Sequence, residues 1–158
     1  MKFLPINNLI EINRVVSSAI LSWQLSKRVY RLSVEQLSYQ LEDLEDHVFI
    51  GGYLGEQLLG VIIWAKYPSQ LPDGTRVRYL HGLYVSQEHQ GCLAGSRLLE
   101  YSVSETIRSC IHALSLKAWR RSEAFFLRNY FVPLIIGEHG DDQLYPKLLV
   151  RYLVENKK

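Results

Sequence analysis

One segment, residues 77–119, constrains the fold of this chain more than any other. An apolar run at 77–85 is followed by a short polar turn, an amphipathic segment and a second apolar run at 112–119. The apolar runs predict strands, and apolar side chains that recur every three or four residues from Leu98 to Cys110 predict a helix between them. A strand–helix–strand unit of this length predicts two parallel strands joined by a right-handed crossover. The chain is therefore expected to be an α/β protein.

The sequence before this unit predicts two helices. Apolar spacing indicates a first helix over 8–23, and Ser33 to Gln36 has the pattern of a capping box that opens a second helix. The basic segment 26–33 between them is expected to be irregular. The second helix is expected to bury the apolar residues Val34, Leu37, Leu41 and Leu44.

Further segments predict strands and one more helix. Two β-rich runs separated by Gly55 and Glu56 predict a hairpin, and 122–130 predicts a helix. The last two strands are predicted at 132–139 and 147–155, with a polar loop between them. The expected order is β-α-α-β-β-β-α-β-α-β-β, an α/β (α+β) fold with a mixed central sheet flanked by helices.

Composition and charge exclude several classes of protein. A chain of 158 residues is long enough for one domain, which we expect to cover residues 1–158. A net charge of +2 gives no reason to expect nucleic acid or an anionic membrane as a partner. No apolar run approaches the roughly 20 residues of a membrane span. The N-terminus lacks a signal-peptide pattern, so a cytoplasmic location is expected.

Cysteine and histidine usage predicts neither disulfides nor a metal site. The two cysteines cannot form a disulfide framework, and the five histidines are scattered without zinc spacing. We therefore expect no metal, and we expect Cys92 and Cys110 to be small buried hydrophobic residues.

The turn after the long strand combines Gln90, Gly91 and Gly95 at the start of a helix. Backbone N–H groups at such a junction, together with the helix dipole, are suited to an anion. A Walker loop would need a lysine and a hydroxyl residue after its second glycine, and a dinucleotide fingerprint would need three glycines; neither is present. The turn predicts a pyrophosphate site without a metal. The alternative is a plain strand-to-helix connection whose glycines serve tight packing.

With its flanks, the segment "LHGLYVSQEHQGCLAGSRLLEY" resembles the coenzyme A loop of the GNAT superfamily, the Gcn5-related N-acetyltransferases. The family pattern has an apolar strand, a Gln or Arg, and glycines at alternate positions before a leucine-rich helix. Gln90, Gly91 and Gly95 match it, whereas Leu93 replaces the middle glycine. The order and lengths of the predicted elements also resemble the single GNAT domain nearly end to end.

This resemblance implies acetyl-CoA as the acyl donor, a primary amine of a small molecule or peptide as the acceptor, and no metal. Because many members of the family pair, a homodimer is also an expectation. The residues implied to bind the coenzyme are Leu83, Tyr84, Val85, Gln90, Gly91, Cys92, Leu93, Ala94, Gly95, Ser96 and Phe126. The alternative function is a catalytically weak acyl-CoA-binding module that regulates a protein partner.

Acyl transfer to an amine requires that the amine lose a proton. His81 is the candidate base, because it lies in the segment where GNAT members often carry a glutamate and because imidazole titrates in the useful range. A water chain to bulk solvent is the equal alternative, and a buried structural histidine is the non-catalytic one. Gly82 inside the strand predicts a bulge or a close approach, and a bulge would aim the Leu83 N–H at the developing oxyanion.

Tyr130 is the candidate for protonating the leaving thiolate. The resemblance implies a Phe-Tyr pair in the fourth helix, but the pair here is Phe125-Phe126. Tyr130 is expected one helical turn after Phe126 on the same face. For Tyr130 and for Tyr84 the alternative is a packing role.

The resemblance also places the acceptor site at two segments of the chain. These are 26–33 and the loop at 137–146. The acidic residues of the second segment, Glu138, Asp141 and Asp142, would favour a cationic amine.

Overall fold

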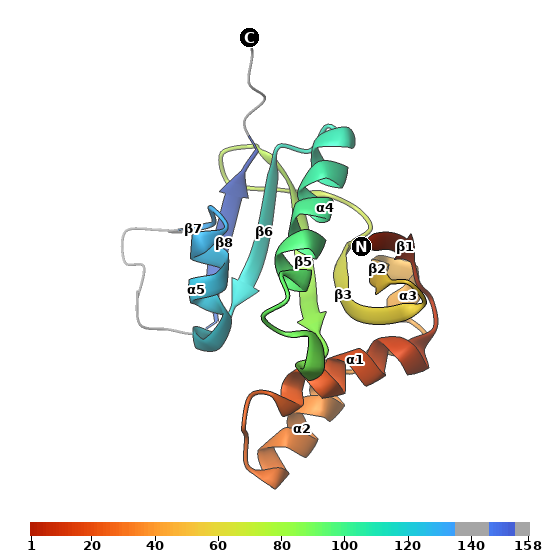
Figure 1. The fold of residues 1–158 in the computed structure, drawn as a ribbon. Helices are drawn as coiled ribbons and strands as arrows, with labels where there is room; N and C mark the ends of the chain where they lie inside the picture. The colour runs from red at the N-terminus through yellow and green to blue at the C-terminus, as the bar shows by residue number, and fades with distance from the viewer. Residues whose placement is uncertain (135–145, 154–158) are drawn as a thin grey trace. The chain divides into compact units, whose positions relative to one another are not determined.

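The computed structural model describes residues 1–134 and 146–153, which form two compact units (Figure 1). The first unit contains Met1–Lys66 and Gly82–Ser102, and the second contains the remaining described residues. Each unit is described here by its own contacts.

One strand and one helix contribute to both units. They are β5 (Arg76–Val85) and α4 (Ala94–Arg108). The strand order is β1-β2-β3-β5-β6-β8-β7, with β4 beside β5. The predicted α/β fold, with a mixed sheet and flanking helices, is confirmed.

The first unit contains an antiparallel hairpin, an edge strand and the N-terminal helices. In chain order its complete elements are β1 (Lys2–Pro5), α1 (Leu9–Leu21), α2 (Lys27–Leu37), α3 (Asp43–Asp46), β2 (His47–Leu54), β3 (Gln57–Ala65) and η1 (Gln87–His89). Strands β1, β2 and β3 pair antiparallel. The predicted hairpin turn at Gly55–Glu56 is confirmed, since Leu54 pairs with Gln57.

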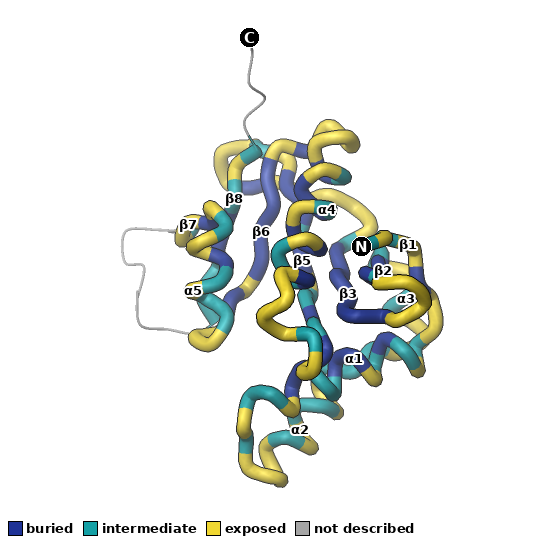
Figure 2. Tube along the Cα trace, viewed as in Figure 1, coloured by how far each residue is buried: buried dark blue, intermediate teal, exposed yellow. Residues whose placement is uncertain are grey.

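Helix α1 covers one face of the strands of the first unit. Its buried side chains pack in one core cluster with Phe49, Val61 and Ile63. Gly60 points to the opposite face, because side chains alternate along a strand. A Cβ on Gly60 would lie 2.6 Å from the Tyr84 carbonyl oxygen, so glycine is needed where β3 approaches β5. Figure 2 shows β3 as buried along nearly all of its length.

The second unit is built around a parallel strand pair. Its complete elements are β4 (Ser69–Gln70), β6 (Ala113–Ala118), α5 (Arg120–Arg128), β7 (Val132–Pro133) and β8 (Lys147–Tyr152). Strands β5 and β6 run parallel, with Val77 opposite Ala113 and Leu80 opposite Leu116. Strand β8 pairs antiparallel with β6 and with β7. The parallel pair predicted from the strand–helix–strand segment is confirmed.

The prediction for the second helix is wrong at both ends. The basic segment 26–33 is helical from Lys27 onward, because the Ser26 side chain accepts a hydrogen bond from the Val29 N–H and caps α2. The helix ends at Leu37, so Ser33 lies inside it and is not its N-cap. Beyond the helix, Leu41 is 70% exposed and does not belong to a buried stripe.

Parts of the predicted C-terminal hairpin lie outside the described residues. The strand predicted at 132–139 is described only at Val132–Pro133, and the one predicted at 147–155 only over Lys147–Tyr152. The acidic loop residues Glu138, Asp141 and Asp142 lie outside the described residues.

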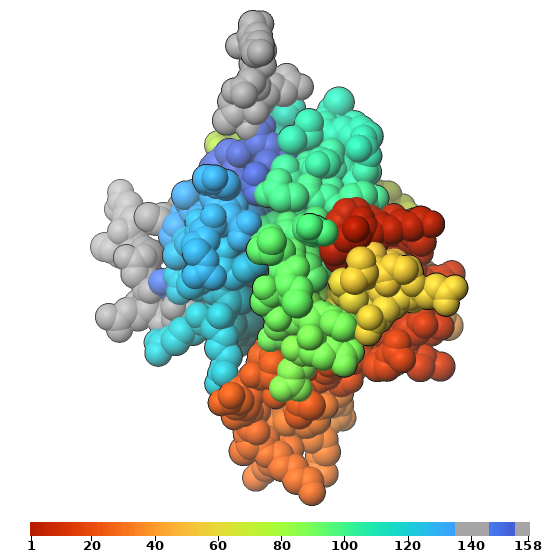
Figure 3. Space-filling view, in the orientation of Figure 1, coloured from red at the N-terminus to blue at the C-terminus, as the bar shows by residue number. Residues whose placement is uncertain are grey.

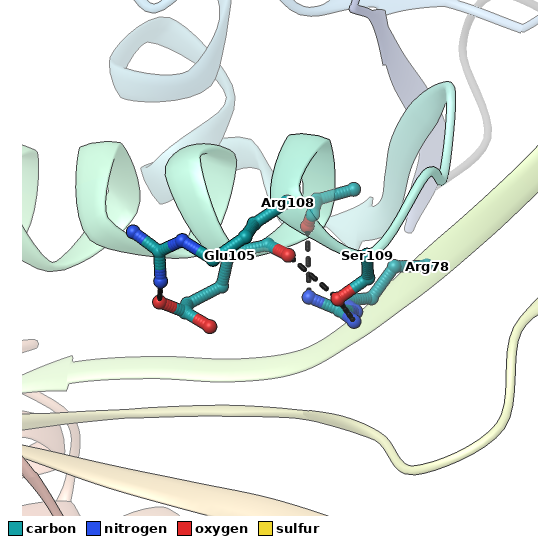
Figure 4. A network of polar contacts seen from close by, with 5 residues as sticks. Arg78, Glu105, Arg108 and Ser109 are labelled. Carbon is teal, nitrogen blue, oxygen red and sulfur yellow. Dashed lines mark hydrogen bonds and ion pairs between the residues drawn. The ribbon is translucent and has the colours of Figure 1, made fainter.

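A buried arginine joins β5 to the last turns of α4 within the second unit (Figure 4). Arg78 donates from Nη1 to Thr106 Oγ1 at 3.1 Å and from Nη2 to Ser109 Oγ at 3.0 Å. Burial lowers the pKa of the Arg78 guanidinium, and the negative charge of Glu105, which pairs with Arg108, opposes that shift. A guanidinium stays charged in proteins, so these hydroxyl acceptors offset part of the cost of burying it.

Thr106→Val should lower the free energy of unfolding by about 1–3 kcal/mol, because the change keeps the shape of a fully buried side chain and removes an acceptor from Arg78. Thr106→Ser is the matched control: it keeps the hydroxyl and loses one methyl group, worth about 1 kcal/mol. Denaturant unfolding measures both variants. A loss in the valine variant that is equal to or smaller than the loss in the serine variant would contradict the role of the hydrogen bond.

Candidate functional site

The junction loop, defined as residues 86–96, comprises the connection from β5 to α4 and the first three residues of α4, all within the first unit. It begins at the buried Ser86, whose N–H donates to the Leu59 carbonyl of β3 at 3.0 Å. The short helix η1 follows, and the His89 N–H donates back to the Ser86 carbonyl at 2.9 Å. The sheet therefore holds the first residue of the loop.

Gln90 ties the middle of the junction loop to two neighbouring elements. Its side-chain Nε2 donates to the Val85 carbonyl at the end of β5 and to Ser22 Oγ at the end of α1, both at 3.0 Å. The amide nitrogen carries two N–H donors, and these two acceptors within the protein use both of them. The side-chain nitrogen of Gln90 therefore holds the loop against α1 and β5. A ligand contact predicted for Gln90 would have to use its side-chain oxygen or its backbone.

Two residues of the junction loop have a left-handed backbone. Gly91 has φ +80° and Leu93 has φ +63°. Glycine adopts this conformation freely, whereas for leucine it costs roughly 1–2 kcal/mol. The Leu93 side chain is 65% exposed, so packing offsets little of that cost. The position where the family pattern has a glycine is thus one whose backbone favours glycine, and it precedes α4 instead of lying inside it.

The start of α4 presents backbone N–H groups. The Arg97 N–H donates to the Leu93 carbonyl at 3.0 Å, which makes it the first hydrogen bond of the helix. The N–H groups of Ala94, Gly95 and Ser96 therefore have no acceptor within α4. The helix is 15 residues long, and its dipole places partial positive charge at this end. Such a helix start is suited to an anion, and the pyrophosphate site that the sequence predicts for this turn stays a prediction.

The last residues of β5 lead directly into the junction loop. Among them Tyr84 is buried in the α1 core cluster, and its ring meets the Tyr39 ring edge-on with centroids 6.5 Å apart. Burial raises the pKa of the Tyr84 phenol, and a hydrogen bond with Tyr39 opposes that shift. A Cβ on Gly82 would collide with the Tyr84 ring, which explains the glycine inside this strand. The packing interpretation of Tyr84 is confirmed, while the bulge and the Leu83 donor stay predictions.

His81 lies on the part of β5 that belongs to the second unit, and its side chain is exposed. Its ring packs edge-on against Tyr79, with centroids 4.8 Å apart. Burial raises the pKa of the Tyr79 phenol, so that phenol is neutral beside the imidazole at neutral pH. The alternative of a buried structural histidine is wrong, and the role of His81 as a base stays a prediction.

Helix α5 ends before Tyr130, contrary to the expectation that it continues to residue 130. Tyr130 follows the end of the helix with a left-handed backbone, φ +65°. Its N–H donates to the Leu127 carbonyl at 3.2 Å, and the Phe131 N–H donates to the Phe126 carbonyl at 3.1 Å. These two bonds form a Schellman motif, which closes the helix.

The side chains of Phe126 and Tyr130 consequently have different surroundings. The Phe126 ring is buried and packs against Phe131 with centroids 5.5 Å apart. The Tyr130 side chain is 77% exposed, and the Arg151 guanidinium carbon lies 5.3 Å from its ring centroid. The expectation that Tyr130 shares a helical face with Phe126 is wrong, because the chain leaves the helix between them. A role for its phenol as an acid stays a prediction.

Residues 17–129, more than half of the chain, match the profile of the acetyltransferase (GNAT) family. The chain belongs to the GNAT family. It is therefore an acetyltransferase by family, and the matched segment includes the junction loop, His81 and Phe126. No curated protein matches the sequence.

Solved GNAT structures share this fold over nearly the whole chain. The PaiA N-acetyltransferase from Thermoplasma acidophilum, solved in complex with coenzyme A, has a TM-score of 0.69 at 15% identity, covering 96% of this chain and 99% of its own. Tetrahymena GCN5 has a TM-score of 0.65 at 16% identity, covering 98% and 97%. An aminoglycoside 6′-N-acetyltransferase complexed with coenzyme A has 0.64 at 12% identity, covering 100% of both chains. At these identities the likeness concerns the fold.

Both cysteines of this GNAT chain are exposed and unbridged, so the expectation that Cys92 and Cys110 are buried is wrong. Within residues 1–134 and 146–153, no group of three or more His, Cys, Asp or Glu residues could hold a metal ion. In the same described part of the chain, no helix combines the length and the apolar character needed to cross a membrane.

Sequence reasoning missed two residues that contact the junction loop. Ser18 and Ser22 of α1 and its cap accept hydrogen bonds from Gln87 and Gln90. Serines in a helix usually bond to their own backbone, so the sequence carries no signal that distinguishes these two.

Leu93→Gly should keep the fold and raise the free energy of unfolding by up to about 1 kcal/mol, because glycine adopts φ +63° without the cost that leucine bears. Leu93→Ala trims the same exposed side chain but keeps the unfavourable backbone, so it should stay near the wild type. Denaturant unfolding compares the three proteins. The glycine variant restores the GNAT pattern and is also expected to bind coenzyme A more tightly. A glycine variant less stable than the alanine variant would show that the Leu93 backbone is not strained.

Proposed function

We propose that the chain is an N-acetyltransferase that uses acetyl-CoA to acetylate a primary amine. The observation that carries the proposal is the start of α4, where the N–H groups of Ala94, Gly95 and Ser96 precede the first hydrogen bond of the helix. Coenzyme A contains a pyrophosphate, which is the kind of anion that such a helix start binds. Two of the similar GNAT structures were solved with coenzyme A, which supports the same ligand here.

The junction loop fits this ligand in shape and charge. Apart from Gly91 and its two chain neighbours, no heavy atom of the described residues lies within 4 Å of the place where a Cβ on Gly91 would stand, so the backbone is accessible there. Arg97 is exposed in the first turn of α4 and adds positive charge. We assign the coenzyme contacts to the following residues: Gln90, Gly91, Cys92, Leu93, Ala94, Gly95 and Ser96 of the loop, Leu83, Tyr84 and Val85 of β5, and Phe126. For the loop and β5 residues, backbone groups make the contacts.

The chemistry of acyl transfer needs a base, a donor to the carbonyl oxygen and an acid. We assign His81 to remove a proton from the acceptor ammonium, so that the amine lone pair can attack the thioester carbonyl. The Leu83 N–H is our candidate for stabilising the negative charge on the carbonyl oxygen. Tyr130 is our candidate for returning a proton to the thiolate.

We further propose that residues 1–158 act as one acyltransferase domain, and that the acceptor is the amine of a small molecule or a peptide. A regulatory module without turnover gains no support from the match, because the matched family is one of acetyltransferases. Coenzyme release in the presence of a panel of amines identifies the acceptor class.

Gly95→Asp should abolish detectable coenzyme A binding, because it adds a negative charge beside the expected pyrophosphate. An acidic residue in the first turn is favourable to a helix, so the variant should remain folded. Gly95→Asn adds a side chain of the same size without the charge, and it should weaken binding only in part. Calorimetry measures the affinity, and circular dichroism checks the fold. Equal affinity of the two variants for coenzyme A would contradict an anion site at this turn.

His81→Ala should lower turnover by roughly 10²-fold, the scale expected when a general base is lost. Coenzyme affinity should change little, because the imidazole acts on the amine. A histidine base must be neutral to work, so the wild-type rate should fall toward acidic pH, and this acidic limb should vanish or move in the variant. His112→Ala is the control, because it removes an exposed histidine that directly precedes β6 in the same unit as His81. Near-full turnover with an unchanged acidic limb would assign proton removal to water.

A further inference from the structure

Two serines at the end of α1 contact the junction loop. Ser18 Oγ accepts a hydrogen bond from the Gln87 N–H at 3.0 Å. Ser22 Oγ, at the cap of the helix, accepts one from Gln90 Nε2 at 3.0 Å. Each serine therefore contacts a different part of the loop, and both contacts lie within the first unit.

The position of the two serines on α1 explains why they meet the loop. Residues four apart lie one above the other on a helix, and Ser18 and Ser22 border the buried side chains Val15 and Ala19. Ser17 lies elsewhere on the helix, and its Oγ donates to backbone carbonyls of α1 at 2.9 and 3.1 Å. The same side chain thus has two different uses within one turn of helix.

The hydrogen bonds of Ser22 form a continuous chain. Its hydroxyl donates to the Ala19 carbonyl at 2.7 Å, which leaves the oxygen lone pairs to accept from Gln90. Gln90 donates its second N–H to Val85, so the chain runs from α1 through the loop to β5. Figure 3 shows the green atoms of this region directly against the orange atoms that follow α1.

We propose that Ser18 and Ser22 are positioning residues for the coenzyme. The proposal rests on the proposed coenzyme site in the junction loop. The N–H groups at the start of α4 can meet one anion only while the preceding turn keeps its left-handed backbone at Gly91 and Leu93. The serines hold η1 and Gln90, and through them the start of that turn. Without these contacts the coenzyme must order the loop as it binds, which lowers affinity.

The affinities of Ser18→Ala, Ser22→Ala and the double variant for coenzyme A test this role, with Ser17→Ala as the matched control. Each single change should raise the dissociation constant roughly threefold to tenfold, the range expected for one net hydrogen bond. The double variant should bind more weakly than either, and Ser17→Ala should bind like the wild type. The KM for acetyl-CoA should rise in the same order with kcat retained, because both serines contact the loop that binds the coenzyme and neither takes part in proton transfer. Ser18→Thr and Ser22→Thr keep the hydroxyl and should bind coenzyme A about as tightly as the wild type.

Hydrogen exchange at the backbone amides of residues 86–96 gives a readout that does not depend on turnover. In Ser18→Ala and Ser22→Ala the amides of this segment should exchange faster than in the wild type, with exchange in β3 unchanged. Unchanged affinity, or an equal loss in Ser17→Ala, would overturn the proposal. If an alanine variant does not fold, Ser18→Cys or Ser22→Cys keeps a side chain of similar shape and weakens the acceptor. A wild-type chain that binds no coenzyme A would refute the proposed function, and exchange in the loop would still decide whether the serines anchor it.

Discussion

The first N–H groups of α4 find no acceptor in their own helix, and the turn that aligns them is held in place by the surrounding structure. The turn that precedes them has a left-handed backbone at Gly91 and Leu93, and fixing such a turn costs conformational entropy. The first unit offsets that cost with contacts from three directions. Strand β3 holds Ser86, while α1 and the end of β5 hold the loop through Gln87 and Gln90. The arrangement of these backbone N–H groups therefore depends on packing and hydrogen bonds outside the loop.

The two ends of α4 differ in a way that fits this role. At its C-terminal end the Cys110 N–H donates to the Ile107 carbonyl at 2.9 Å and the Ile111 N–H donates to the Thr106 carbonyl at 3.1 Å, which are the bonds of a Schellman motif. Arg78 adds side-chain contacts near the same end. The carbonyl groups at the C-terminal end of α4 are thus covered by donors, whereas the first N–H groups at the other end have no acceptor within the helix.

Patterns that depend on neighbours in sequence predicted much of the fold. The parallel pair β5 and β6, the hairpin turn at Gly55 and the helix α4 all follow from apolar spacing and turn residues, which act over a few positions. The second helix was mispredicted because Ser26 and Ser33 both have capping chemistry, and the choice between them depends on which face packs against the core. The left-handed end of α5 at Tyr130 had no signal, since glycine is the usual residue there.

The sequence by itself determined the family, the strand–helix–strand unit and the position of the turn before α4, because each depends on residue types at short spacing. Only the tertiary structure decided how that turn is held. The amide of Gln90 could have contacted a ligand, yet its donors lie on Val85 and Ser22. Ser17 and Ser18 are neighbours of identical chemistry, but only Ser18 contacts the loop. A hydrogen bond between residues far apart in the chain depends on where packing places two elements, and that placement is a property of the folded molecule.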